Sequence, residues 1–112
     1  KELQVISDFY DLTLYLIQRV EKFPRHHRYS LGTSVESRLQ TILALLLRAR
    51  YTRDRSACLA DANIELEILR FQLRLAKDLQ ALPLRSHGHA AKLLEGIGAQ
   101  LGGWLKKSGG RP

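Results

Sequence analysis

The sequence predicts an all-α fold, an up-down-up-down four-helix bundle, on three observations. The 112 residues are 45% apolar, and the apolar residues include 22 leucines but only 3 valines, a bias toward helix formers and away from β-branched strand formers. Three clusters of turn-forming residues divide the chain into four segments. Each segment repeats apolar residues at intervals of three and four, the spacing of one helix face. Four helices of about 20 residues joined by short loops fit such a bundle, in a single domain over residues 1–112.

The breaks place the helices at about residues 2–22, 24–51, 56–81 and 86–107. The first break is Phe23-Pro24, because proline restricts the residue before it and cannot continue a helix inward. The second is residues 51–56, where turn formers cluster, and the third surrounds Pro83.

The same spacing predicts a core face for each helix. In the first helix it comprises Leu3, Ile6, Tyr10, Leu14 and Ile17. In the second it comprises Leu31, Val35, Leu39, Ile42, Leu46 and Ala49. In the third it comprises Ala62, Leu66, Leu69, Leu73 and Ala76. In the fourth it comprises Ala91, Leu94, Ile97, Leu101, and Trp104 or Leu105.

Two signals compete for the start of the second helix. Residues 33–36, Thr-Ser-Val-Glu, have the form of a capping box, whereas Pro24 suits a first helical position. The residues leave both starts open. The fourth helix has Lys106 and Lys107 in its last turn and Gly109 as a stop.

Two helices carry more apolar surface than a small bundle needs. The third has a second apolar stripe away from its core face, and residues 43–47 make the second helix apolar nearly all round. A helix that is apolar on two sides needs cover on two sides, so we expect a homo-oligomer, with exposed apolar surface or a broad core as the alternative. The stripe comprises Ile64, Ile68, Phe71, Leu75, Leu79 and Leu82. The residues expected in the subunit interface are Leu43, Leu45, Leu47, Ile64, Ile68, Phe71 and Leu75.

The charge balance favours a polyanionic partner. Lys and Arg number 18 against 11 Asp and Glu, which gives a net charge of +7. The basic excess lies in residues 23–53 and 83–112. The candidate contacts to nucleic acid are Arg25, Arg28, Arg38, Arg48, Arg50, Arg53 and Arg55 on and around one helix, Arg70, Arg74 and Lys77 on the next, and Lys106, Lys107 and Arg111 at the end.

Solvated surface charge is the alternative to nucleic-acid binding. Glu67 and Asp78 lie where local ion pairs could neutralise Arg70 and Arg74. The chain has 3 Phe, 4 Tyr and 1 Trp, several of them in the expected core, which leaves few platforms for base stacking. Binding is therefore expected to be phosphate-directed, salt-sensitive and weakly sequence-specific.

No residue pattern points to catalysis, a metal or a cofactor. The histidine pairs His26-His27 and His87-Gly88-His89 lack the spacing of a zinc site. Cys58 has no partner cysteine and no base marked for it, so a packing role is expected. No pair of carboxylates stands out for acid-base work, and the sequence offers no positive sign of an enzyme.

Four glycines in residues 96–103 lie inside a helical period with no strand before them, which excludes a nucleotide-binding loop. Each glycine destabilises a helix interior by about 1 kcal/mol relative to alanine. We therefore expect a neighbouring helix to approach closely across Gly98 and Gly102, with Trp104 filling the space beyond.

The longest apolar run, residues 42–47, has six residues, whereas a membrane span needs roughly 20. The sequence shows no signal-peptide pattern and has a single cysteine. A soluble protein of the reducing cytoplasm fits these observations.

Three motifs carry a resemblance through their joint order and spacing. They are Phe23-Pro24-Arg25 followed by Arg28-Tyr29-Ser30-Leu31, then residues 69–76 (LRFQLRLA), then residues 101–106 (LGGWLK). In these motifs the chain resembles, over nearly its whole length, the accessory variability determinant (Avd) proteins of bacterial diversity-generating retroelements.

The resemblance implies a basic, non-catalytic four-helix bundle that assembles as a barrel-like homopentamer without a cofactor. It implies that the protein binds RNA or DNA and associates with the retroelement reverse transcriptase during mutagenic copying of a template RNA. Carried over to this chain, it makes Arg70 and Arg74 the expected contacts to nucleic acid or polymerase.

Two alternatives stay open. The Avd proteins belong to a wider group of four-helix bundles that includes proteins encoded in intervening sequences of ribosomal RNA genes. The second-helix pattern of that branch, Arg-Ala-Ala and Asn-Ile-Ala-Glu-Gly, is absent from residues 39–50, which favours the Avd branch. The other alternative is a structural interaction module whose basic surface docks an acidic protein.

Overall fold

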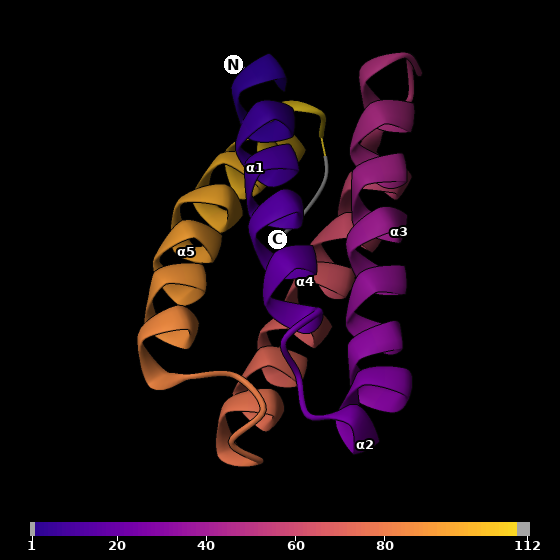
Figure 1. Ribbon diagram of the computed structural model, residues 1–112. Helices are drawn as coiled ribbons and strands as arrows, with labels where there is room; N and C mark the ends of the chain where they lie inside the picture. Colours follow the sequence, from indigo (N-terminus) through magenta and orange to yellow (C-terminus); the bar gives the residue numbers. More distant parts are fainter. Residues whose placement is uncertain (1, 110–112) are drawn as a thin grey trace.

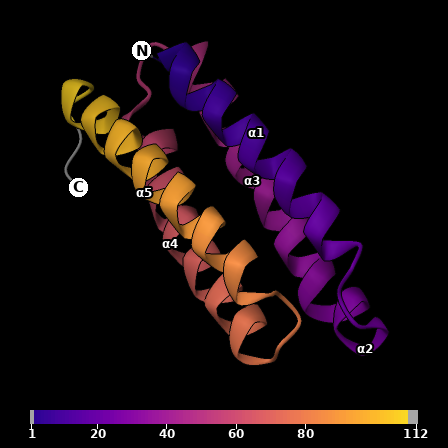
Figure 2. The same ribbon diagram turned by 60° about the vertical axis from the view of Figure 1, so that its left-hand side comes forward.

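The computed structural model describes residues 2–109, and in this part of the chain four long helices form an up-down-up-down bundle. The long helices are α1 (Glu2–Val20), α3 (Thr33–Arg50), α4 (Ser56–Asp78) and α5 (Leu84–Lys107). Figure 1 shows their alternating direction, and Figure 2 shows α1 beside α3 and α4 beside α5. Contacts between α3 and α4 and between α1 and α5 close the ring of four. The predicted fold class is confirmed.

The second helical segment begins at Arg25 with Pro24 as its N-cap, one residue later than expected, which resolves the choice between its two start signals. A short helix, α2 (Arg25–His27), follows Pro24 and continues through a π-helical turn, η1 (Arg28–Gly32), into α3. Thr33 donates its hydroxyl to the Arg28 carbonyl at 3.3 Å, so it serves the π turn and caps no new helix. The capping-box start is wrong because the backbone is already helical on entering Thr33.

Gly32 lets this turn pack against the end of α1. A β-carbon added at Gly32 would lie 2.8 Å from Cγ1 of Val20 and 3.5 Å from Cδ2 of Phe23. Both neighbours are buried in the core. A larger residue at position 32 would therefore push the turn away from α1.

The predicted core face of α1 is wrong. Tyr10 and Leu14 are 56% and 51% exposed, Ile6 and Ile17 are only partly buried, and the side chain of Leu3 lies outside the described part of the structure. The buried face comprises Val5, Phe9, Leu12, Leu16 and Val20. Both faces have helical spacing, so periodicity alone did not separate them. The buried face is the one that continues into Val20 and Phe23, whereas the predicted face runs into Glu21.

The predicted core faces of α3 and α4 are confirmed, with Leu31 only partly buried at the start of the second face. In α5 the prediction holds from Leu94 onward, with both Trp104 and Leu105 buried, but Ala90 is buried in place of Ala91. Leu82 also differs from expectation, because it lies in the core and not on the outer stripe of α4.

Three helix ends differ from expectation by two or three residues: the ends of α1 and α4 and the start of α5. The helix α4 ends at Asp78 because Gln80 adopts a positive φ of 62° and the amides of Ala81 and Leu82 both donate to the Ala76 carbonyl. Pro83 then stands as the N-cap of α5, which begins at Leu84.

Candidate nucleic-acid interface

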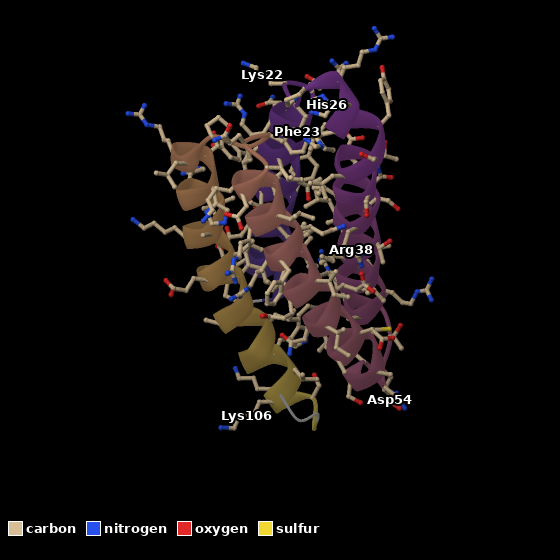
Figure 3. The ribbon with its side chains drawn as sticks, turned by 90° about the horizontal axis from the view of Figure 1, so that it is seen from below. Lys22, Phe23, His26, Arg38, Asp54 and Lys106 are labelled. Atoms are coloured by element: carbon tan, nitrogen blue, oxygen red, sulfur yellow. The ribbon has the colours of Figure 1, made fainter. Side chains whose placement is uncertain are left out.

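Six cationic residues are grouped at one end of the bundle, where α3 ends, α4 begins and α5 ends. We call this group the basic end. Figure 3 shows Asp54 and Lys106 at this end and Lys22 and His26 at the other. The basic end comprises Arg48 and Arg50 in the last turn of α3, Arg53 and Arg55 in the loop before α4, and Lys106 and Lys107 in the last turn of α5.

The fold explains part of this grouping. The carboxyl ends of α3 and α5 meet at the basic end, and cations in a last helical turn are stabilised by the helix dipole. Arg55 has a further packing role, since its Cζ lies 5.8 Å from the ring centroid of buried Trp104. Asp54, the acidic residue of this loop, accepts a hydrogen bond from the Ser56 hydroxyl at 3.3 Å.

Tyr51 projects from the basic end into solvent. Its side chain is 78% exposed, and Cζ of Arg50 lies 5.3 Å from its ring centroid. Its amide donates to the Arg48 carbonyl at 3.2 Å, and the hydroxyl of Thr52 donates to the same carbonyl at 2.7 Å. The backbone that carries the ring is therefore anchored to the last turn of α3.

Tyr29 repeats this arrangement at the opposite end. It is 71% exposed, with Cζ of Arg28 at 5.6 Å from its ring centroid. Phe9, Phe23 and Trp104 are buried, as expected of several aromatic residues, whereas Tyr29 and Tyr51 are exposed rings beside arginines. The sequence signal was available, because Tyr29 and Tyr51 lie outside the apolar periods of the helices.

Of the other predicted arginine contacts, Arg25, Arg28 and Arg38 do not join the basic end, and Arg111 lies outside the described residues. Arg25 and Arg28 lie at the far end of a bundle 42 Å long. Arg38 lies between α3 and α4, where it pairs with Glu65 and donates to Oε1 of Gln72 at 2.9 Å. Gln72 in turn donates to the Ser34 hydroxyl at 2.7 Å. The guanidinium of Arg38 thus links α3 to α4 through these contacts.

The three predicted contacts on α4, Arg70, Arg74 and Lys77, form a basic strip whose members have different surroundings. Arg70 donates to the Leu94 carbonyl on α5 at 3.1 Å and lies 3.9 Å from Glu67. Lys77 pairs with Asp78 at 3.6 Å, so the expected pairing of Asp78 with Arg74 is not observed. Arg74 is exposed and has no hydrogen bond or ion pair to residues 2–109. Of the strip, Arg74 is therefore the cation that is best placed to meet an external anion.

The predicted subunit-interface residues also divide. Ile64, Ile68, Phe71 and Leu75 form an exposed apolar stripe on α4 that continues to Leu79. On α3, Leu47 is exposed, but the side chains of Leu43 and Leu45 pack against the core. These two leucines therefore have cover within the bundle.

The expected close helix approach occurs at Gly98 but not at Gly102. A β-carbon at Gly98 would lie 2.5 Å from Nη2 of Arg70, whereas one at Gly102 would meet nothing within 4 Å. The neighbour at Gly98 is an arginine side chain and the Leu66 methyl, so the approach is made by side chains from α4. Gly96 and Gly103 also face open space.

The histidines and the cysteine show no arrangement for chemistry within residues 2–109. His26 and His27 stack on one another at 4.1 Å between ring centroids, and His89 packs on Tyr15 at 4.6 Å. Cys58 is a free, partly buried thiol. This part of the chain has no group of three side chains able to hold a metal ion, and none of its helices is long and apolar enough to cross a membrane.

His87 has an altered pKa. Burial lowers the pKa of this imidazole below 6.5, the nearby ammonium group of Lys77 lowers it further, and Asp78 acts in the opposite direction. The neutral form is therefore favoured in the folded protein.

These features define a small, basic four-helix bundle with six cationic residues grouped at one end and an exposed apolar stripe on α4. A family model described as bAvd-like matches residues 4–108, and the chain belongs to this family. The family match confirms the resemblance to Avd proteins. A comparison with curated proteins found no match to the chain. The bAvd-like family is not a known family of enzymes.

Proposed function

We propose that this protein is a non-catalytic accessory subunit of a retroelement reverse transcriptase, which binds template RNA or its DNA copy together with the polymerase. Membership of the bAvd-like family supports the accessory role. The observation that carries the nucleic-acid contact is the grouping of six cationic residues at the basic end.

Electrostatics give the binding its physical basis. The net charge of +7 attracts a polyanion over a long range. The six residues of the basic end come from three separate segments of the chain, so their charges add over one surface. When these cations neutralise phosphates, they release counterions from the nucleic acid, so the affinity falls steeply with salt. Arg74 adds an exposed cation on the flank.

Self-assembly is the second part of the proposal. The stripe of Ile64, Ile68, Phe71, Leu75 and Leu79 has no cover in the described part of the chain, and an apolar surface of this kind is removed from water by association. The resemblance to Avd proteins suggests a homopentamer. In any such ring the basic end is repeated, which multiplies the binding surface for one nucleic acid.

The nucleic-acid contact is tested by comparing two triple variants of equal charge. In one, Arg53, Lys106 and Lys107 at the basic end are replaced by Glu. In the control, the exposed cations Lys22, Arg85 and Lys92 are replaced by Glu. Affinity for a labelled single-stranded RNA is measured by fluorescence anisotropy over a salt series.

We expect the basic-end variant to bind far more weakly and to show a smaller salt slope, by about 0.7 for each phosphate that the protein no longer neutralises. The control variant is expected to bind more weakly only to a small extent. Equal reductions in affinity would contradict a localised contact. A wild-type chain that shows no salt-dependent RNA binding would contradict the function, and would favour the alternative of docking to an acidic protein.

Assembly is tested by light scattering coupled to size exclusion. Phe71→Glu places a charge in the α4 stripe and should lower the mass of the assembled protein. Leu14→Glu is the matched control, because Leu14 is also an exposed leucine but lies on α1, a different helix from the stripe. A wild-type mass equal to that of one chain at micromolar concentration would contradict self-assembly.

A further inference from the structure

We propose that Tyr51 is a stacking platform for an unpaired base of a single-stranded nucleic acid. This inference rests on the proposed function, but it adds a different kind of contact. The cations of the basic end can bind any phosphate backbone, whereas a stacking ring needs a base that is free of its own duplex.

The exposure of Tyr51 has no explanation within the described part of the chain. At 78% it is the most exposed of the large hydrophobic side chains that the structure describes. Exposed Phe71 belongs to the apolar stripe of α4, but the neighbours of Tyr51 in the chain are Arg50, Thr52 and Arg53. An exposed aromatic ring beside an arginine, in a segment rich in cations, is poorly suited to an apolar subunit contact and well suited to a base with its phosphates.

The ring is carried by an ordered backbone. Tyr51 is the C-cap residue of α3, and its amide and the Thr52 hydroxyl are both bonded to the Arg48 carbonyl. A tyrosine has only two side-chain torsions to order on binding, so a ring on a fixed backbone loses little conformational entropy when a base stacks on it.

The cations near Tyr51 are suited to bind the phosphate of a nucleotide whose base stacks on the ring. Cζ of Arg50 lies 5.3 Å from the ring centroid, within the range of a cation–π contact. Arg48, Arg53 and Lys106 belong to the same basic end. Sites that bind single strands combine a basic surface for the backbone with aromatic rings for the bases, and the basic end has both components.

Tyr29 is a second position with the same combination. It is 71% exposed and lies beside Arg28. It belongs to the π turn η1, a type of helical distortion that is frequent at functional sites. Tyr29 is therefore a second candidate position for stacking.

The test uses three labelled probes with the full chain: a short single-stranded RNA, the same strand paired with its complement, and an abasic strand with the same number of phosphates. Tyr51→Leu removes the ring but keeps an apolar side chain, and Tyr51→Phe keeps the ring. Tyr10→Leu is the matched control, because Tyr10 is also an exposed tyrosine but lies on α1, outside the basic end.

We expect Tyr51→Leu to weaken binding of the single-stranded RNA by roughly five- to one-hundred-fold, the range that stacking of one base gives. Binding of the duplex and of the abasic strand should not change. Tyr51→Phe and Tyr10→Leu should bind all three probes as the wild type does. A Tyr51→Trp variant should show quenching of its added tryptophan fluorescence by the single strand only.

Three results would overturn the proposal. Unchanged single-strand affinity of Tyr51→Leu would exclude stacking while leaving phosphate binding intact. An equal reduction in affinity for the abasic strand would assign Tyr51 to the electrostatic surface. A lower assembled mass of Tyr51→Leu would assign the ring to a subunit contact. If the wild type binds none of the probes, the proposed function fails together with this inference.

Discussion

The guanidinium of Arg70 on α4 lies directly over Gly98 on α5. Its Nη2 donates to the Leu94 carbonyl at 3.1 Å, and a β-carbon at position 98 would lie 2.5 Å from that nitrogen. The missing side chain at position 98 therefore makes the space that Arg70 occupies. Arg70 joins two helices of the bundle, whereas Arg74, one turn further along α4, faces solvent.

Arg70 and Arg74 should therefore respond differently to the same substitution. Arg70→Ala removes a charged hydrogen bond between helices and should lower the free energy of unfolding by about 1 kcal/mol. The effect is smaller than for a buried charged group because the side chain of Arg70 is partly exposed. Arg74→Ala should leave stability within about 0.5 kcal/mol and should weaken RNA binding. Urea unfolding and salt-dependent anisotropy measure the two effects. Equal decreases in stability would contradict the separation of roles.

The contact of Arg38 with Glu65 and Gln72 predicts a stability effect without a binding effect. Arg38→Met leaves Glu65 and Gln72 without their partner in a setting where the Arg38 and Glu65 side chains are 23% and 27% exposed. We expect the free energy of unfolding to fall by about 1–2 kcal/mol, less than for a fully buried pair. A double-mutant cycle with Glu65→Gln isolates the pair. Weaker RNA binding by a well-folded Arg38→Met would show that Arg38 also contacts the ligand.

Two glycine-to-alanine substitutions should change the stability of the protein in opposite directions. Gly32→Ala places a β-carbon 2.8 Å from buried Val20 and should destabilise the protein by about 1–3 kcal/mol. Gly96→Ala meets nothing within 4 Å and should stabilise α5 by about 1 kcal/mol through helix propensity. Thermal unfolding of both variants provides the measurement. Destabilisation by Gly96→Ala would show that the surface of α5 is covered in the assembled protein.

The lowered pKa of His87 predicts a pH dependence of stability. The folded protein holds a proton on His87 less tightly than the unfolded chain does, so the unfolded chain binds more protons below pH 6.5. The contribution of neutral His87 to the free energy of unfolding is therefore fully present above pH 6.5. It is lost as the pH falls through the lower pKa that His87 has in the folded state. Urea midpoints measured between pH 7.5 and pH 5 should fall less in His87→Gln than in the wild type. In Lys77→Gln the fall should also be smaller, because one cause of the shift is removed. Identical pH profiles for the three proteins would contradict this assignment.

Periodicity predicted the core where polar residues bound an apolar face. On α4 the core face is separated from the second apolar stripe by Glu67, Arg70 and Arg74 on one side and by Glu65 and Gln72 on the other, so the core was identified correctly. On α1 two apolar faces overlap, and the choice between them depends on the packing partners, which single-sequence spacing does not contain. Tyr10 and Phe9 are neighbours in the chain, yet one is exposed and the other fully buried.

The candidate site was predictable in part. An up-down bundle places the carboxyl ends of α3 and α5 at the same end. Topology alone therefore predicts that Arg53 and Lys106 lie at one end of the bundle. The ion pair between Arg38 and Glu65 depends on the register between α3 and α4. The exposure of Tyr51 depends on the cap that ends α3. Register and cap geometry are set by tertiary packing, which a pattern of residue types does not specify.

The glycines of α5 also bear on how the folded protein opens. The helix contains Gly88, Gly96, Gly98, Gly102 and Gly103, and each lowers its intrinsic helix stability by about 1 kcal/mol relative to alanine. Local unfolding free energies vary along a chain, and the weakest segment opens first. Amide hydrogen exchange should therefore proceed sooner in α5 than in α3 or α4. Such an opening would release Arg70 from the Leu94 carbonyl and expose the core side of α4 while the other three helices stay folded.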